Sequence, residues 1–201
     1  MRRPDDTTTE KARAAETGHA EAIVGCMMAG KTSELIRRIQ RSQIAGVDCE
    51  LYKPVVDDRH GTETITGHNG LEIDAVPVES PAEIRDRTTD PGVVGLDEVQ
   101  FFPAEPLIET VEALVADGVR VVAAGLDLDF KSEPFSATRE LLARADYVEK
   151  LQAVCTVCGD PATRTQRLLD GEPAPSDDDR VLIGADETYE ARCRAHHVVP
   201  E

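Results

Sequence analysis

The feature that most constrains the fold of this chain is a glycine-rich turn between an apolar run and a helical pattern, IVGCMMAGKTSELIRRI at residues 23–39. The apolar residues before the turn predict a short buried strand over Glu21–Gly25, and those after it predict a helix over Thr32–Gln43. The turn itself has the pattern G-x-x-x-x-G-K-[ST], which is met by Gly25, Gly30, Lys31 and Thr32. Between a strand and a helix, this pattern indicates a phosphate-binding loop rather than a chance glycine turn, because its backbone N–H groups can point at phosphate oxygens.

Further apolar segments alternate with helical patterns along the chain. Strands are predicted over Cys49–Pro54, Val93–Glu98 and Arg120–Asp127, and a helix is predicted over Pro106–Asp117. This alternation predicts an α/β fold of the P-loop NTPase, RecA-like type, with a parallel sheet and helices on both faces. Ligands of such sheets bind beyond the carboxyl ends of the strands, where the phosphate-binding loop is also expected.

Composition divides the chain into three parts. Residues 1–19 are predicted to form a polar, disordered tail, residues 20–150 the nucleotide-binding domain, and residues 151–201 a small zinc-binding module with a long polar loop. No apolar run is long enough to span a bilayer, and the first residues lack the apolar segment of a secretory signal. We therefore expect a cytoplasmic protein with no membrane partner.

The chain is strongly acidic. Its net charge is −17, from 22 basic and 39 acidic residues, and few of the basic residues are lysines. This balance favours adaptation to high salt, where screening reduces repulsion between like charges, over an ordinary acidic protein. It also argues against a nucleic-acid partner, which requires a basic surface.

Two charged segments follow predicted strands. Asp97 and Glu98 end one of them, where one carboxylate could hold the water shell of Mg²⁺ and the other could accept a proton. We favour Glu98 over Asp97 as the base, and the alternative is a strand end that simply reaches solvent. In the segment DDRHG, Arg59 could hold phosphate oxygens and Asp57 could support magnesium, although a solvated charged turn would have the same sequence.

Two pairs of metal-ligand residues lie near the end of the chain. Cys155 and Cys158 form C-x-x-C, and Cys193 and His196 form C-x-x-H. Three thiolates and one imidazole suit a tetrahedral, structural Zn²⁺ site, whereas a lone C-x-x-C could also be a redox dithiol. His197 is a rival for the fourth position, although the spacing favours His196.

Taken together, these segments resemble the type II thymidine kinases, the family that includes the cytosolic human-type enzyme and many bacterial ones. The resemblance covers roughly Glu21 to Pro200 and rests on five matches in order. They are GCMMAGKTSELIRRI, YKPVVDDRHG, DEVQFF, GLDLDFKSEPF, and the zinc region KLQAVCTVCGDPATRTQRL with YEARCRAHH.

The resemblance implies a role for each matching residue. Those implied to bind ATP and its magnesium are Gly25, Cys26, Met27, Met28, Ala29, Gly30, Lys31, Thr32, Asp57, Asp97, Val99 and Gln100. Glu98 would accept the proton of the thymidine 5′-hydroxyl, and Arg59 would assist catalysis. Those implied to bind thymidine are Phe101, Leu126, Phe130, Phe135, Thr165, Arg180, Val181, Leu182, Ile183, Gly184 and Tyr189, of which residues 180–184 belong to a "lasso" loop over the base.

We therefore expect a thymidine kinase that uses ATP and Mg²⁺, contains structural Zn²⁺, forms a homotetramer and is inhibited by thymidine triphosphate. Two rivals remain: a RecA-like ATPase, which would be stimulated by single-stranded DNA, and a zinc protein that senses nucleotides without turnover. A GTPase is less favoured because the sequence has no N-K-x-D motif.

Overall fold

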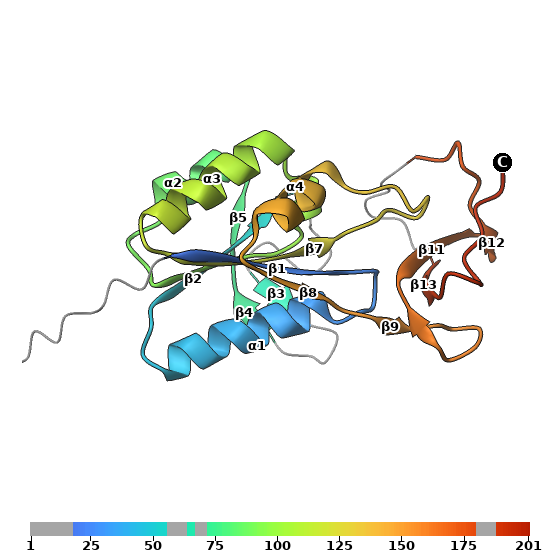
Figure 1. Ribbon diagram of the computed structural model, residues 1–201, viewed down its shortest axis with the longest axis horizontal. Coiled ribbons are helices and arrows are strands. Elements are labelled where there is room, and N and C mark those ends of the chain that lie inside the picture. Colours follow the sequence, from blue (N-terminus) through green and yellow to red (C-terminus); the bar gives the residue numbers. More distant parts are fainter. Residues whose placement is uncertain (1–17, 56–63, 67–71, 180–187) are drawn as a thin grey trace, which may run out of the picture.

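The computed structural model describes residues 18–55, 64–66, 72–179 and 188–201, and its centre is a six-stranded sheet (Figure 1). Every neighbouring pair of strands in this sheet is parallel. The strands, in spatial order, are β5 (Val76–Val78), β2 (Cys49–Pro54), β6 (Val93–Leu96), β7 (Arg120–Leu126), β1 (His19–Gly25) and β8 (Tyr147–Lys150). The predicted α/β fold with a parallel sheet is thus confirmed, and β7 lies between the loop-bearing strand β1 and the strand β6 that precedes Asp97.

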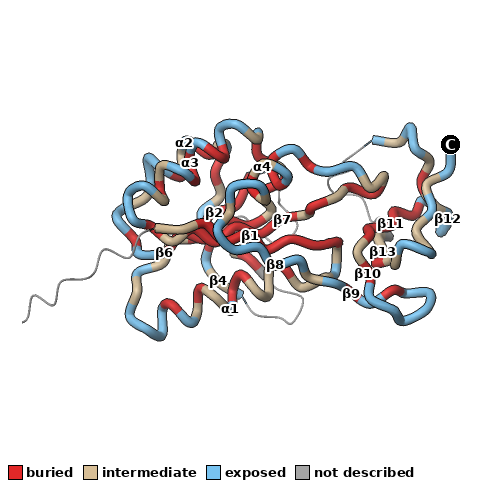
Figure 2. The backbone as a smooth tube through the Cα atoms, viewed as in Figure 1, coloured by how far each residue is buried: buried red, intermediate tan, exposed pale blue. Residues whose placement is uncertain are grey.

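Helices cover both faces of the sheet. Helix α1 (Lys31–Ile44) lies on one face, and α2 (Pro81–Arg87), α3 (Ala104–Ala116) and α4 (Ser136–Arg144) lie on the other (Figure 1). The side chains of β7 alternate accordingly: Val121 and Ala123 pack with α3, whereas Val122 and Ala124 pack with α1. Buried residues therefore concentrate in the sheet and on the helix faces turned toward it (Figure 2).

Two element boundaries show how the site is shaped. Helix α1 begins directly after Gly30, whose φ of 86° is left-handed, and ends before Gly46, whose φ is 77°. Strand β6 is shorter than predicted and ends at Leu96 instead of Glu98. It ends early because Glu98 takes the left-handed conformation, with φ of 50°, and starts a 3₁₀ turn, η1 (Val99–Phe101).

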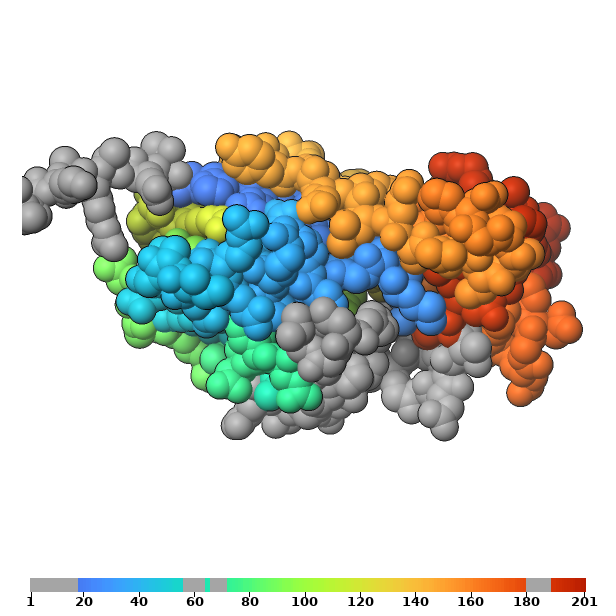
Figure 3. Space-filling model, turned by 90° about the horizontal axis from the view of Figure 1, so that it is seen from below, coloured from blue at the N-terminus to red at the C-terminus, as the bar shows by residue number. Residues whose placement is uncertain are grey.

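The C-terminal part is a separate small arrangement of antiparallel strands. Strand β9 (Ala153–Val154) pairs with β10 (Pro161–Ala162), and β11 (Arg164–Leu169) lies between β12 (Glu172–Pro173) and β13 (Thr188–Arg192). These strands lie at one end of the molecule, beyond the carboxyl ends of the parallel strands (Figures 1 and 3). A further antiparallel pair, β3 (Thr64–Thr66) and β4 (Glu72–Asp74), contributes Ile65 to the core on the α1 side. Among the described residues, no helix is long and apolar enough to cross a membrane.

A buried ion cluster ties α1 to the amino ends of the strands. Glu21 of β1 is only 7% exposed and accepts hydrogen bonds from Arg38 of α1 and Arg120 of β7. Burial by itself would raise the pKa of Glu21, but the hydrogen bonds from Arg120 and Arg38 outweigh it and lower the pKa to about 2. The carboxylate is therefore charged in the folded protein at any ordinary pH.

Glu21→Gln should destabilise the fold, because it removes the buried counter-charge of Arg120 and leaves Arg38 with Glu34 and Glu149 only. Since the folded pKa of Glu21 lies below the unfolded value of 4.5, its contribution is fully present above that pH and is lost as the pH falls toward about 2. Denaturant unfolding of both proteins should show a difference in free energy that is largest at neutral pH and shrinks in acid. Glu149→Gln is the matched control, because Glu149 contacts the same Arg38 from the surface and should have little effect. A deficit no larger than that of the control would contradict this assignment.

Candidate nucleotide and zinc sites

The turn after β1 has the backbone of a phosphate-binding loop. Gly25 has a φ of 153°, and a Cβ at this position would lie 2.6 Å from the carbonyl oxygen of Leu151, so only glycine fits there. Met28 and Gly30 are also left-handed, with φ of 64° and 86°. These conformations curl the loop at the carboxyl edge of the sheet, immediately before the amino end of α1, where an anion is favoured.

Lys31 supplies the positive charge of this loop. Its side chain is buried, and its ammonium group donates a hydrogen bond of 2.9 Å to the carbonyl oxygen of Cys26 within the loop. Burial lowers the pKa of Lys31, while the carboxylates of Glu98 and Asp97 act to raise it. The Lys31 ammonium therefore lies near two acidic side chains, and from within the loop it can bind the terminal phosphates of a nucleotide.

Thr32 and Asp97 come together although 65 positions separate them. The Thr32 hydroxyl donates to Oδ2 of Asp97 at 3.1 Å, and the backbone N–H of Glu98 donates to Oδ1 at 3.0 Å. Burial and the neighbouring charge of Glu98 raise the pKa of Asp97 to about 7. A hydroxyl beside a buried carboxylate with uncompensated negative charge fits a Mg²⁺ site, because such oxygen ligands are those that magnesium prefers.

Glu98 is held in an unusual backbone conformation. Its φ and ψ of 50° and 40° are left-handed, which is uncommon for a residue with a side chain and frequent at functional sites. Its carboxylate accepts a hydrogen bond from the amide of Gln100, which is buried behind it. The structure thus brings together Lys31, Thr32, Asp97 and Glu98 at one edge of the sheet, as the sequence predicted.

The aromatic residues expected around a base lie on two neighbouring segments. Phe130 and Phe135 are buried in the connection between β7 and α4, where the N–H of Phe135 donates to the carbonyl of Asp127, and Phe101 is half-buried at the end of η1. Tyr189 lies on β13, opposite Arg167. Of the remaining predicted site residues, the following lie outside the described residues: Asp57, Arg59, Arg180, Val181, Leu182, Ile183 and Gly184.

The C-terminal strands contact the phosphate-binding loop directly. The hydroxyl of Thr165 accepts a hydrogen bond of 3.1 Å from the N–H of Met27, and the thiol of Cys26 donates to the carbonyl of Ala162 at 3.4 Å. Cys26 also packs in a small apolar cluster with Ala153, Cys155, Ala162 and Ala191. The conformation of the loop therefore depends on the C-terminal module.

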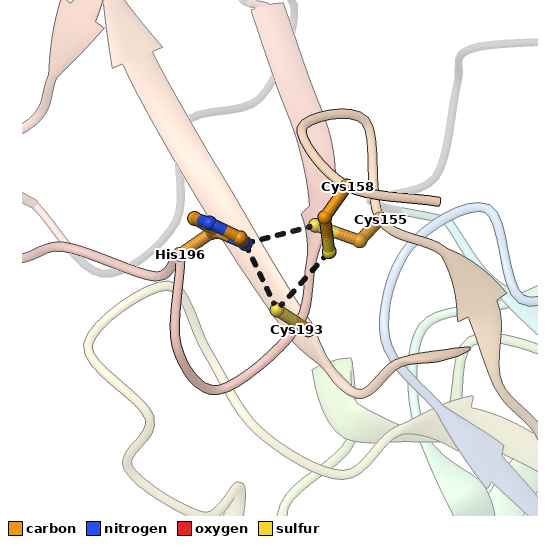
Figure 4. A group of neighbouring side chains, drawn as sticks. All are labelled: Cys155, Cys158, Cys193 and His196. Atoms are coloured by element: carbon orange, nitrogen blue, oxygen red, sulfur yellow. Dashed lines mark hydrogen bonds between the residues drawn. The ribbon is translucent and has the colours of Figure 1, made fainter. Parts of the chain in front are cut away.

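Four side chains of this module converge on one point (Figure 4): Cys155, Cys158, Cys193 and His196. Their ligand atoms all lie within 4.8 Å of one another, and the Sγ atoms of Cys158 and Cys193 are 3.7 Å apart. Tetrahedral zinc with bonds of about 2.3 Å to sulfur would place two thiolates about 3.8 Å apart, so the cluster fits Zn²⁺. With four protein ligands, the site is of the closed, structural kind.

The distances distinguish His196 from His197 as the candidate for the fourth ligand position. Nδ1 of His196 lies 3.2 Å from the Sγ of Cys193, whereas Nε2 of His197 lies 2.8 Å from the carbonyl oxygen of Phe130. Burial lowers the pKa of His197, which favours the neutral ring that donates to this carbonyl. His197 therefore connects the module to the segment that contains Phe130, and His196 is the one of the two histidines that could ligate a metal with the three thiols.

Arg167 of β11 is fully buried and was not among the predicted site residues. Its guanidinium lies 5.2 Å from the ring centre of Phe130, donates to the carbonyl of Asp179 and lies 3.4 Å from the carboxylate of Asp178. It fixes the chain just before residue 180 against an aromatic residue of the larger domain. No local pattern marks it, because its partners lie 37 positions before it and more than ten positions after it.

A parallel sheet with a phosphate-binding loop, a carboxylate pair after a neighbouring strand and a module with a cluster of four possible zinc ligands is the arrangement of a P-loop nucleotide-binding protein. The family model described as thymidine kinase matches residues 18–197, nearly the whole chain. The protein belongs to the thymidine kinase family.

Cys158→Ser should abolish zinc binding and weaken thymidine binding, because the segment between the two ligand pairs would then be anchored at one end only. Metal analysis and calorimetric titration with thymidine measure the two effects. Cys49→Ser is the matched control, since the Cys49 thiol contacts only backbone carbonyls near α1 and should leave the zinc content unchanged. Full zinc content and unchanged thymidine affinity in Cys158→Ser would show that the cluster has no such role.

Proposed function

We propose that the protein transfers the γ-phosphate of ATP to the 5′-hydroxyl of thymidine, giving thymidine monophosphate and ADP. The observation that carries this proposal is the convergence of Lys31, Thr32, Asp97 and Glu98 at the end of β1 and β6, in a chain of the thymidine kinase family. The loop supplies the phosphate site, and the carboxylates supply a metal site and a base.

The phosphates of ATP would be held by the backbone N–H groups of residues 25–32 and by Lys31, whose ammonium would exchange its bond to Cys26 for phosphate oxygens. Thr32 and Asp97 would hold Mg²⁺, with Asp57 as a further support. When bound, the magnesium ion neutralises charge on the β- and γ-phosphates. Val99, which the resemblance also assigns to the nucleotide site, packs in the core and would hold the start of η1 in place.

Glu98 would act as the base. Its carboxylate would accept the proton of the 5′-hydroxyl as the oxygen attacks the γ-phosphorus, and the bond from that phosphorus to the ADP oxygen would break. Arg59, which follows β2, would stabilise charge on the transferring phosphoryl group. Positioning and electrostatics would provide most of the acceleration.

Thymidine would bind between the β7–α4 connection and the zinc module. Phe101, Phe130 and Phe135 would surround the base, with Leu126 and Thr165 at its edge, because apolar and aromatic walls suit a pyrimidine. Residues 180–184 and Tyr189 would complete the pocket. The zinc ion would fix both ends of the segment between the two ligand pairs, in a module whose apolar cluster has only small residues.

We further propose a cytoplasmic homotetramer that is inhibited by thymidine triphosphate, as the family resemblance implies. The free edge of the sheet supports a subunit contact, since β8 exposes Tyr147 and Val148.

The deciding experiment measures ADP release from ATP and Mg²⁺ with and without thymidine, in molar KCl. Thymidine-dependent ADP, with thymidine monophosphate as the second product, is the expected result. ADP released equally without thymidine, and more with single-stranded DNA, would replace the proposal by an ATPase. Bound ATP without any ADP, in zinc-loaded protein, would replace it by a nucleotide sensor.

Glu98→Gln should lower kcat roughly a hundredfold or more while ATP and thymidine still bind, because the amide cannot accept the hydroxyl proton. Steady-state kinetics and calorimetric titration measure the two quantities. Glu149→Gln serves as a control, being the same substitution on the surface. Near-full activity of Glu98→Gln would remove Glu98 as the base.

Activity should rise as KCl or NaCl is raised to molar concentration, because screening relieves the repulsion among the carboxylates of a chain with a net charge of −17. Initial rates at saturating substrates, measured over a series of salt concentrations, test this. An optimum in dilute buffer would reject adaptation to high salt.

A further inference from the structure

Gln100 is one of the few buried polar residues beside the carboxylate pair. It lies in η1, two positions after Glu98, and is only 7% exposed. We propose that Gln100 is a positioning residue, which fixes the Glu98 carboxylate in its reactive place by joining it to the backbone of β7. This inference rests on the proposed function, since it assigns Gln100 a task in the action of Glu98 as the base.

The orientation of the Gln100 amide is determined by its neighbours. The backbone N–H of Leu126 lies 3.0 Å from Oε1 of Gln100, and a backbone N–H can only donate. The oxygen of the amide must therefore face β7, and the nitrogen must face the other way. There it donates to Oε2 of Glu98. Both ends of the amide are engaged, and the contact with Glu98 gives Gln100 a role beyond the nucleotide binding that the resemblance implies.

The backbone of Leu126, whose N–H binds the Gln100 amide, is itself held in place. Leu126 pairs with Gly25 at the end of the parallel ladder, and its carbonyl accepts a hydrogen bond of 2.8 Å from Thr138 of α4, which is completely buried. The N–H that orients Gln100 is thus held by the sheet and by α4 together. The fixed N–H of Leu126 can therefore orient the Gln100 amide and, through it, the flexible carboxylate of Glu98.

The contact between Gln100 and Leu126 has room because Gly125 carries no side chain. A Cβ on Gly125 would lie 2.7 Å from Oε1 of Gln100 and 2.8 Å from a methyl group of Val99. The amide could not reach the N–H of Leu126 past such an atom. The absence of a side chain at Gly125 is therefore an independent observation that the backbone of β7 accommodates the Gln100 amide.

The neutral amide of Gln100 gives the Glu98 carboxylate a hydrogen-bond donor that is itself held by the backbone of β7. A neutral donor orients the carboxylate without pairing its charge, so Glu98 can still act as a base toward the substrate hydroxyl.

The test is a double-mutant cycle of Gln100→Met and Glu98→Gln, measured as thymidine-dependent ADP release. Methionine fills a similar volume without the hydrogen bonds. Gln100→Met should lower kcat about tenfold or more and leave both KM values within about twofold, because the residue acts in the chemical step. In the Glu98→Gln background, Gln100→Met should lower kcat no further, because the carboxylate that Gln100 positions is then absent.

Two results would overturn the inference. One is an unchanged kcat with a raised KM for ATP or thymidine in Gln100→Met, which would make Gln100 a direct ligand. The other is an equal loss in both backgrounds, which would mean that it does not act through Glu98. If the wild-type protein releases no thymidine-dependent ADP, it is the proposed function that fails.

Two further variants separate positioning from folding. Thr110→Val removes another buried hydrogen bond from a side chain to the backbone, that of Thr110 to the carbonyl of Pro81, and should reduce stability without changing kcat. Gln100→Glu keeps an oxygen for the N–H of Leu126 but turns a second carboxylate toward Glu98. It should lower kcat at least as far as methionine does, and wild-type kcat in this variant would overturn the inference even if Gln100→Met does not fold.

Discussion

Parallel pairing of β6, β7 and β1 is the constraint on which the rest of the structure depends. Because the three strands run in the same direction, their carboxyl ends meet at one edge of the sheet. The loop after β1, the carboxylates after β6 and the aromatic segment after β7 are therefore neighbours, although they are far apart in sequence. The contact of Thr32 with Asp97 and that of Gln100 with Leu126 both follow from this pairing.

The zinc module completes the same edge from outside the sheet. Its apolar cluster has only small residues, so a metal at the Cys3His cluster would add stability that this small core lacks. Through Thr165 and Ala162 the module hydrogen-bonds to the phosphate-binding loop, and through Arg167 and His197 it contacts Phe130. The module thus contacts both the nucleotide side and the base side of the proposed cleft.

Charge is distributed so that a very acidic chain can still bind an anion. At the amino ends of the strands, Glu21 is neutralised by Arg38 and Arg120. At the carboxyl ends, the positive end of α1 and the buried ammonium of Lys31 face the phosphate site. The two carboxylates after β6 lie side by side, and burial and the neighbouring charge of Glu98 raise the pKa of Asp97, so a cation would be favoured beside them.

The sequence by itself determined the elements whose signal is local. The G-x-x-x-x-G-K-T turn, the α/β alternation and the two ligand pairs each depend on residues a few positions apart, so their spacing was sufficient to predict them. The expected roles of Asp57, Arg59 and residues 180–184 stay predictions. The spacing also favoured His196, whose Nδ1 lies beside the thiol of Cys193. Tertiary structure alone decided that β6 ends at Leu96, that His197 faces Phe130, and that Arg167 and Gln100 meet Phe130 and the backbone of Leu126. The last three contacts join segments that only the folded chain brings together, and no periodicity or spacing encodes which distant group a buried side chain will meet.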